Sequence, residues 1–166
     1  MLFMDALELD MPEQYDTNKN QTAHNTADDE GRHESTGTLL PDLVQWNMDR
    51  EITKARLAFS SGAYKEIVSP LWGCGAFNGD PFVKMLLLWI AASTIPPEQP
   101  DEGPPALTVV CDDSLRDIAH ELTKVLDLVK LRLKTVGELR NLLNSMPKDV
   151  KRLETGQWLV EYLHSL

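Results

Sequence analysis

Cysteine is scarce in this sequence: among 166 residues only Cys74 and Cys111 occur, far apart and in no C-x-x-C pair. Small disulfide scaffolds and cysteine-based zinc modules need more cysteines at closer spacing. The sequence therefore argues against both classes of protein and favours a reducing compartment.

Positive charge and long apolar runs are also lacking. The 16 Lys and Arg stand against 26 Asp and Glu, which gives a formal net charge of −10. An acidic chain has no long-range attraction for nucleic acid or for an anionic membrane, so we predict no direct DNA binding. The longest apolar run, residues 85–95, is too short to span a bilayer, and the first residues carry no basic signal-peptide segment. These features predict a soluble intracellular protein with no membrane partner.

Apolar residues almost disappear between residues 11 and 40. Such a stretch buries too little surface to offset the entropy of ordering it, so we predict a disordered polar insertion. His24 and His33 lie within it without helical or strand periodicity around them, and we predict solvated histidines rather than metal ligands. The chain thus divides into residues 1–10, the insertion and an ordered part at 41–166. No metal or cofactor is predicted.

Two helices are predicted early in the ordered part. Asp49 is the expected N-cap of the first helix, which ends before Gly62. Asp80 and Pro81 are the expected cap and first-turn proline of the second helix. This second helix is apolar on nearly all sides, and we therefore expect it to be buried.

Three more helices are predicted towards the C-terminus. One follows the cap-forming residues 112–114, with apolar residues at three- and four-residue steps. The next begins with a capping box between Thr135 and Glu138 and ends at Pro147. The last is expected to run over residues 149–166.

Only one strand is clear in the sequence. The β-branched run Ala106–Cys111 predicts a buried strand, and weaker strand signals occur at Leu2–Met4 and Glu66–Val68. The alternation of helices and strands predicts an α/β fold. A sheet of mean size has about five strands, so the predicted sheet is incomplete.

Residues 70–82, PLWGCGAFNGDPF, place two glycines around a cysteine just before the capped second helix. A G-x-G pattern alone is a weak signal, because any tight turn can use it. Between an apolar stretch and a helix start, however, backbone N–H groups can converge on a phosphate. The pattern fits a ligand-binding loop and a purely structural turn equally well, and leaves both open.

Three further residues near these elements have polar or reactive side chains. Cys74 could act as a nucleophile near a helix N-terminus, but no histidine lies nearby in the sequence, and a packed cysteine is favoured. Asp112 and Asp113 directly follow the clear strand, a position suited to catalysis or to contact with a ribose. The alternative is that one of them, or Ser114, simply caps the next helix, and we favour this cap over catalysis and, less strongly, over ligand contact.

Several segments together resemble the poly(ADP-ribose) glycohydrolase family. LWGCGAFNGDPFVKMLLLWIAAS, residues 71–93, is similar to the family's glycine-rich loop and following helix, whose usual form is close to W-G-C-G-A-F-G-G-D. KTVGELRNLL (134–143) resembles its late helix, MDALELD (4–10) its D-A-L segment past a core strand, and DREITKARLAFSSG (49–62) its helix before the loop. Order and approximate spacing agree over nearly all of the chain outside residues 11–40.

The resemblance implies a macrodomain-like, three-layer α/β/α fold, of which this chain would hold the C-terminal half, with residues 1–10 as the end of a strand of the catalytic domain. It implies poly(ADP-ribose) or ADP-ribose as the partner, and the nucleus or the cytoplasm as the location. VVCDDS (109–114) lies where the family has a ligand-contacting turn. The substrate-binding residues implied are Gly73, Cys74, Gly75, Ala76 and Phe77 around the diphosphate, and Cys111 and Asp112 at this second turn.

Three positions depart from the family pattern. Cys111 stands near where many members place an aromatic residue against the ligand, so this chain has no aromatic ring at that position. Asn78 replaces the first glycine of the usual G-G-D, and Leu71 stands where an asparagine often precedes the tryptophan.

The family's catalytic segment is a further departure. The family hydrolyses ribose–ribose bonds of poly(ADP-ribose), with a glutamate of a Q-E-E motif after a triple-glycine loop acting as general acid. Neither GGG nor QEE occurs in this sequence. We therefore expect this chain to keep the diphosphate loop but to be inactive alone, and the resemblance leaves open whether it is an enzyme. The alternative is a non-catalytic ADP-ribose-binding module or a remnant interaction domain.

Overall fold

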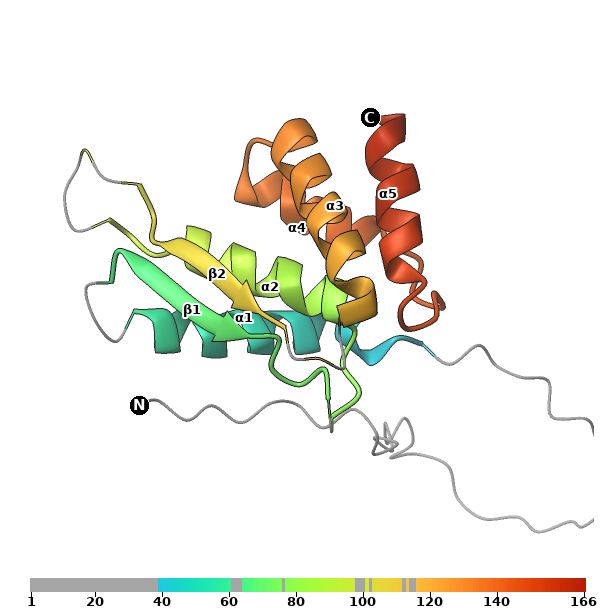
Figure 1. Ribbon diagram of the computed structural model, residues 1–166, viewed down its shortest axis with the longest axis horizontal. Coiled ribbons are helices and arrows are strands. Elements are labelled where there is room, and N and C mark those ends of the chain that lie inside the picture. Colours follow the sequence, from blue (N-terminus) through green and yellow to red (C-terminus); the bar gives the residue numbers. More distant parts are fainter. Residues whose placement is uncertain are drawn as a thin grey trace, which may run out of the picture.

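The computed structural model describes residues 39–60, 64–75, 77–97, 101, 103–111, 113 and 116–166. The elements, shown in Figure 1, are η1 (Pro41–Leu43), α1 (Gln45–Phe59), β1 (Glu66–Pro70), α2 (Pro81–Ser93), β2 (Ala106–Val110), α3 (Arg116–Arg132), α4 (Val136–Ser145) and α5 (Thr155–Ser165). The strand expected at Leu2–Met4, the polar insertion up to residue 38 and Gly62 lie outside the described residues.

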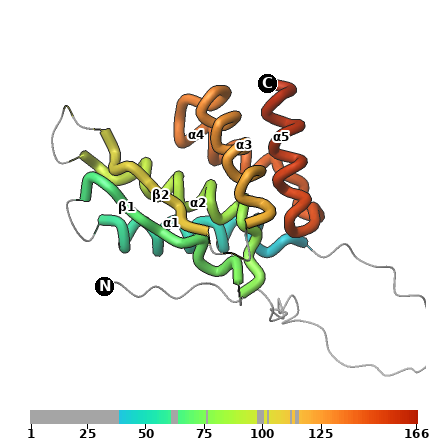
Figure 2. Tube along the Cα trace, in the orientation of Figure 1, coloured from blue at the N-terminus to red at the C-terminus, as the bar shows by residue number. Residues whose placement is uncertain are grey.

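The two strands β1 and β2 are parallel neighbours, with Ile67 opposite Leu107 and Ser69 opposite Val109. Parallel neighbours need a crossover connection, and α2 lies in that connection. Figures 1 and 2 show α1 and α2 together behind the strands, on one face of the sheet. In the described part of the chain the predicted α/β class is therefore confirmed, and so is the weakly signalled strand at β1.

The second strand, β2, is a strand as predicted, but the expectation that it is buried is wrong. Its residues alternate between exposed and half-buried. Val110 is 50% exposed, and on the same face of the neighbouring strand Val68 is 63% exposed. The reason is that α1 and α2 cover one face of this pair of strands. In the described part of the chain no element covers the other face, so its side chains are exposed to solvent.

Helix α2 is the centre of the described core, as its apolar sequence predicts. Its side chains are buried nearly all round, including Phe82, Val83, Leu86 and Leu88. Helices α1, α3, α4 and α5 and strand β2 all contact it. Burying one side chain of this size stabilises a fold by roughly 1.5–3 kcal/mol. Within the described residues, no helix combines the length and apolarity needed to cross a membrane.

Two of the predicted caps, at α2 and α4, are present. The Asp80 carboxylate accepts hydrogen bonds from the N–H groups of Phe82 and Val83, each at 3.0 Å. At α4, the Thr135 hydroxyl accepts from the Glu138 N–H at 3.1 Å, and the Glu138 carboxylate accepts from the Thr135 N–H at 2.8 Å. Because these bonds connect residues two or three positions apart, the sequence alone identifies them.

Two predicted helix starts are wrong. Helix α1 begins at Gln45, so Asp49 lies inside it, where its carboxylate accepts from the Gln45 side chain and pairs with Arg140. Helix α5 begins at Thr155 rather than near Asp149. The chain before Thr155 contains Leu153 at φ 72°, a left-handed conformation that an α-helix cannot contain.

Candidate functional site

The glycine loop, residues 71–80, connects the end of β1 to the start of α2. Pro70 at the end of β1 is paired with Val110 at the end of β2, so the loop and the turn after β2 leave the same edge of the sheet. The carboxyl edge of a parallel sheet is the usual place for a ligand site. The fold thus brings the two predicted turns together. Ala76 and Asp112 lie outside the described residues.

The loop is closed by hydrogen bonds within its own backbone. The N–H of Cys74 donates to the carbonyl of Leu71 at 3.3 Å, that of Asn78 to Gly75 at 3.0 Å, and that of Gly79 to Gly73 at 2.7 Å. These bonds fold the ten residues into a compact turn.

Two loop residues adopt the left-handed backbone conformation. Gly73 has φ 80°, which glycine adopts without steric cost. Asn78 has φ 53°, and asparagine tolerates this region better than other residues with a side chain. The asparagine that replaces a family glycine therefore keeps the backbone shape that the loop needs.

Gly79 is required for a different reason, which is close contact. A Cβ atom placed there would lie 2.7 Å from the Gly73 carbonyl oxygen and 2.8 Å from the Cε atom of Lys84. Gly75, in contrast, has nothing within 4 Å of the same position and is exposed. One glycine lets two backbone segments meet, and the other leaves open space on the outside of the loop.

Several backbone carbonyls of the loop accept hydrogen bonds, while several of its N–H groups donate none. The carbonyls of Leu71, Gly73, Cys74, Gly75 and Gly79 all accept hydrogen bonds. Among the described residues, the loop N–H groups that donate to no acceptor are those of Trp72, Gly73, Gly75 and Phe77. A turn with several free backbone donors is suited to holding an anion.

The start of α2 cannot itself supply donors to that anion. Asp80 is fully buried, and its carboxylate already accepts from the first-turn N–H groups of Phe82 and Val83. The same carboxylate also accepts from the N–H of Leu153 at 2.9 Å and from the hydroxyl of Thr155. Any ligand at this edge must therefore be held by the loop rather than by the end of the helix.

A buried charge cluster supports the loop from inside the core. The Asp80 N–H donates to the Asp42 carboxylate at 2.7 Å, and the Lys84 ammonium lies 3.2 Å from Asp42 and 2.8 Å from Glu51. Burial raises the pKa of Asp42 more strongly than Lys84 lowers it. Burial lowers the pKa of Lys84, but Asp42 and Glu51 outweigh it, so that pKa is raised and the lysine stays charged.

This cluster was not predicted from the sequence, although one signal for it was present. Lys84 is the single charged residue in a helix that is otherwise apolar all round. A lysine in a fully buried helix needs carboxylate partners. Which carboxylates these are, Asp42 and Glu51, follows only from the fold.

Cys74 is a core residue. Its side chain is 3% exposed, and burial together with the nearby Asp42 raises the pKa of its thiol to about 12. The thiol is therefore protonated at neutral pH, and the packed-cysteine interpretation is confirmed over the nucleophile. Cys74 contributes to the loop through the hydrogen bonds of its backbone N–H and carbonyl rather than through its thiol.

The second turn is described at two positions. Cys111 is half-buried at the end of β2. Asp113 points to solvent, where its carboxylate pairs with Arg116 at 2.9 Å and is 92% exposed. This exposed pair lies beside the first turn of α3, and the other residues of the predicted cap, Asp112 and Ser114, lie outside the described residues.

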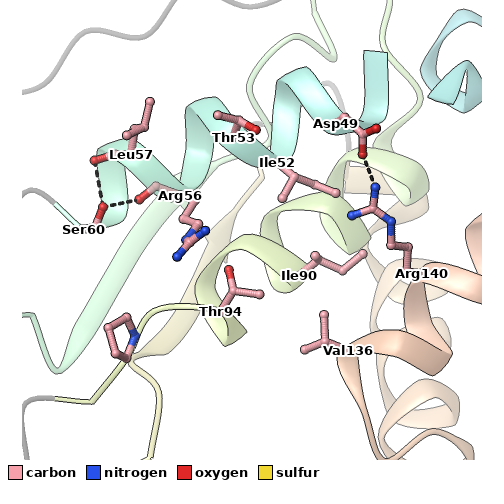
Figure 3. Close-up of a pocket in the computed structure, with 11 residues that line it drawn as sticks. Asp49, Ile52, Thr53, Arg56, Leu57, Ser60, Ile90, Thr94, Val136 and Arg140 are labelled. Atoms are coloured by element: carbon pink, nitrogen blue, oxygen red, sulfur yellow. Dashed lines mark hydrogen bonds and ion pairs between the residues drawn. The ribbon is translucent and has the colours of Figure 1, made fainter. Parts of the chain in front are cut away.

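A separate cavity of about 730 Å³ lies between α1, α2 and α4 (Figure 3). Ile52, Ile90 and Val136 supply its apolar lining, and the ion pair between Asp49 and Arg140 stands at one end. No residue of the glycine loop lines it. We therefore treat the loop and the turn after β2 as the candidate site.

Comparison with known proteins identifies similar sequences. The family model described as poly(ADP-ribose) glycohydrolase (PARG), macro domain fold, matches residues 13–98, which include β1, the glycine loop and α2. Poly(ADP-ribose) glycohydrolase 1 of Caenorhabditis elegans is 32% identical over 116 residues, which are 68% of this chain and 14% of that protein. Probable poly(ADP-ribose) glycohydrolase 2 of Arabidopsis thaliana is 27% identical over 126 residues, 76% of this chain and 20% of that protein. The chain thus spans 20% or less of the length of these two relatives.

Proposed function

Because this chain belongs to the poly(ADP-ribose) glycohydrolase family, we propose that its glycine loop binds the diphosphate of an ADP-ribose unit, free or within poly(ADP-ribose). The observation that carries the proposal is the presence of free N–H groups at Gly75 and Phe77 in a turn whose Cys74 and Gly79 carbonyls are held by hydrogen bonds. Hydrogen bonds from N–H groups to an anionic oxygen are short and about twice as strong as neutral ones.

The neighbouring residues complete the proposed site. Phe77 is partly exposed next to the free donors, and its ring can pack against the ribose that adjoins the diphosphate. The chain after β2 leaves the same edge of the sheet, and we propose that Cys111 and Asp112 contact the ligand from this second turn. With a cysteine at this turn, the site has a smaller side chain there than an aromatic ring would provide.

The proposed binding does not depend on surface cations. The loop itself contains no Lys or Arg, and the whole chain carries a net charge of −10. Affinity for a polyanion falls with salt mainly where Lys and Arg neutralise phosphates. We therefore expect the affinity for ADP-ribose to change little between low and moderate salt.

Hydrolysis of the polymer needs a group that the described residues around the loop do not offer. Asp80 and Asp42 are the carboxylates next to the loop, and both are buried and committed to structural hydrogen bonds. Neither GGG nor QEE occurs in the sequence. Loss of a general acid costs roughly 10²–10⁴-fold in rate. We propose that these 166 residues bind ADP-ribose without hydrolysing the polymer.

Calorimetry with ADP-ribose tests the binding proposal. Gly75→Trp should abolish binding without unfolding the chain, because the space around Gly75 is open and a ring there would fill the ligand position. Gly103→Trp is the matched control, since Gly103 also has open space around it and lies outside the loop. Absence of binding heat at millimolar ADP-ribose would rule the proposal out. Release of ADP-ribose from the polymer by the purified chain would contradict the proposed inactivity.

A further inference from the structure

We propose that Arg152 is a positioning residue that holds the glycine loop in its ligand-binding conformation. Arg152 lies in the segment between α4 and α5, more than 70 residues after the glycine loop in the sequence. Its Nε donates to the carbonyl of Gly79 at 3.1 Å, and its Nη2 donates to the carbonyl of Cys74 at 2.9 Å. The proposal rests on the proposed function only in naming ADP-ribose as the ligand.

The geometry of the peptide bond explains why the contact with Cys74 matters. The Cys74 carbonyl and the Gly75 N–H belong to the same peptide unit, and in a planar trans peptide they point in opposite directions. When Arg152 fixes the carbonyl on one side, the Gly75 N–H is directed to the other side. This N–H is one of the free donors of the loop.

The contact with Gly79 fixes the other end of the same turn. The Gly79 carbonyl shares its peptide unit with the Asp80 N–H, which donates to Asp42 at 2.7 Å. That peptide unit is therefore held from both sides, by Arg152 and by the buried carboxylate. A guanidinium is a rigid, planar fork of donors, so one side chain fixes the two carbonyls relative to each other.

The segment that carries Arg152 is itself anchored. The neighbouring Leu153 has φ 72°, a strained conformation for a residue with a branched side chain, and its N–H donates to Asp80 at 2.9 Å. Thr155 also donates to Asp80. The guanidinium lies at the Cys74 and Gly79 carbonyls, and among the described residues it forms no ion pair. No carboxylate there neutralises its charge, which therefore adds positive potential for a diphosphate at the loop.

The test compares Arg152→Gln and Arg152→Lys with the full 166-residue chain, using ADP-ribose titration and the amide signals of the loop in NMR. Lys151→Gln is the matched control, because it removes the same charge one residue earlier from a side chain that is 81% exposed. We expect Arg152→Gln to weaken ADP-ribose binding by about 10- to 100-fold, since a small misplacement of positioning groups can cost on the order of 10²-fold. The affinity of Arg152→Lys for ADP-ribose should lie between those of Arg152→Gln and the unaltered chain, because an ammonium keeps the charge but lacks the rigid fork. Lys151→Gln should bind ADP-ribose as the unaltered chain does.

The amide signals separate this inference from the proposed function. In Arg152→Gln, the Gly75 amide resonance should shift and the Gly79 N–H should exchange with solvent at least about tenfold faster as its closed state is lost. The amides of α4 should stay unchanged. These readouts need no ligand, so they still judge Arg152 if ADP-ribose fails to bind. Unchanged Gly75 and Gly79 amides in both variants would overturn the inference, as would an equal loss of protection throughout α4 and α5.

Discussion

The Thr155 hydroxyl lies 2.9 and 2.8 Å from the two carboxylate oxygens of Asp80. Asp80 caps α2, and Thr155 is the first residue of α5, so one buried carboxylate joins the starts of two helices. The same carboxylate receives the N–H of Leu153. The glycine loop ends at this carboxylate, which couples its position to the C-terminal helix.

Replacing Asp80 by alanine should destabilise the chain strongly. The change removes the cap of α2 and leaves the buried hydroxyl of Thr155 and the part-buried N–H of Leu153 without their acceptor. The loss of one cap costs about 1 kcal/mol, and the unsatisfied buried hydroxyl adds about 1–3 kcal/mol, so we expect at least about 2 kcal/mol. Urea denaturation measures the free energy of unfolding.

Thr135→Ala is the control for this change, because Thr135 caps α4 at an exposed site. Its loss should cost only about 1 kcal/mol. If the two alanine variants lose equal stability, Asp80 acts as an ordinary cap and does not join the helices.

Removing the charge of Lys84 should be more harmful than removing the whole cluster. Lys84→Met leaves the carboxylates of Asp42 and Glu51 buried without their cation. Breaking a buried ion pair in this way costs about 3–5 kcal/mol, whereas replacing all its members by uncharged groups is often close to neutral. We therefore expect the triple variant Asp42→Asn, Glu51→Gln, Lys84→Met to unfold at a higher urea concentration than Lys84→Met alone. The reverse order would show that the cluster is a net stabiliser.

Local signals allowed most of the elements to be predicted, because each depends on a few adjacent residues. The cap at Asp80 and the box at Thr135 and Glu138 connect positions two or three apart, and the structure contains both. Asp49 shows the limit of this reasoning. It has the chemistry of a cap, but the helix starts earlier, and its carboxylate pairs with Arg140 from another helix.

The residues that shape the loop could not be predicted, because their partners are far away in sequence. Arg152 looks like an ordinary surface arginine in the sequence, and only the fold brings it to the carbonyls of Cys74 and Gly79. The same holds for the partners of Lys84. The sequence identified the glycines as candidates, while the groups that hold them in place follow from tertiary contacts.

The Cys74 thiol should make the chain less stable at alkaline pH. Burial raises its pKa from 9.0 to about 12 in the folded chain, so above pH 9 the unfolded chain loses this proton while the folded chain keeps it. The unfolded state is then favoured, and stability falls by roughly 1.4 kcal/mol per pH unit between these two pKa values. Cys74→Ala should lack this part of the pH dependence. Urea denaturation of both chains at pH 8 and pH 10 measures the difference, and parallel losses would contradict the buried thiol.

Stability should depend on glycine at position 79 of the loop but tolerate glycine at position 78. Gly79→Ala would place a Cβ 2.7 Å from the Gly73 carbonyl oxygen, so we expect a loss of about 1–3 kcal/mol and weaker ADP-ribose binding. Asn78→Gly should be close to neutral, because glycine adopts φ 53° easily, whereas Asn78→Ala should cost about 1 kcal/mol. Gly75→Ala is the control, with open space at its Cβ. A Gly79→Ala chain as stable as the Gly75→Ala chain would mean that the loop is looser than described.

Glycine-to-alanine changes at Gly156 and Gly137 should have opposite signs, although both residues occupy the second position of a helix. At Gly137 the nearest atom to a new Cβ is 3.8 Å away, so the better helix propensity of alanine should stabilise the chain by about 0.5–1 kcal/mol. At Gly156 the new Cβ would lie 2.4 Å from the ring of Phe82, which is fully buried beneath the other helices and has no room to move. Overpacking of a core typically costs about 1–3 kcal/mol and should exceed the gain in propensity. Thermal or urea unfolding of the two variants measures both signs, and a stabilised Gly156→Ala chain would show that α5 does not pack against Phe82 as closely as described.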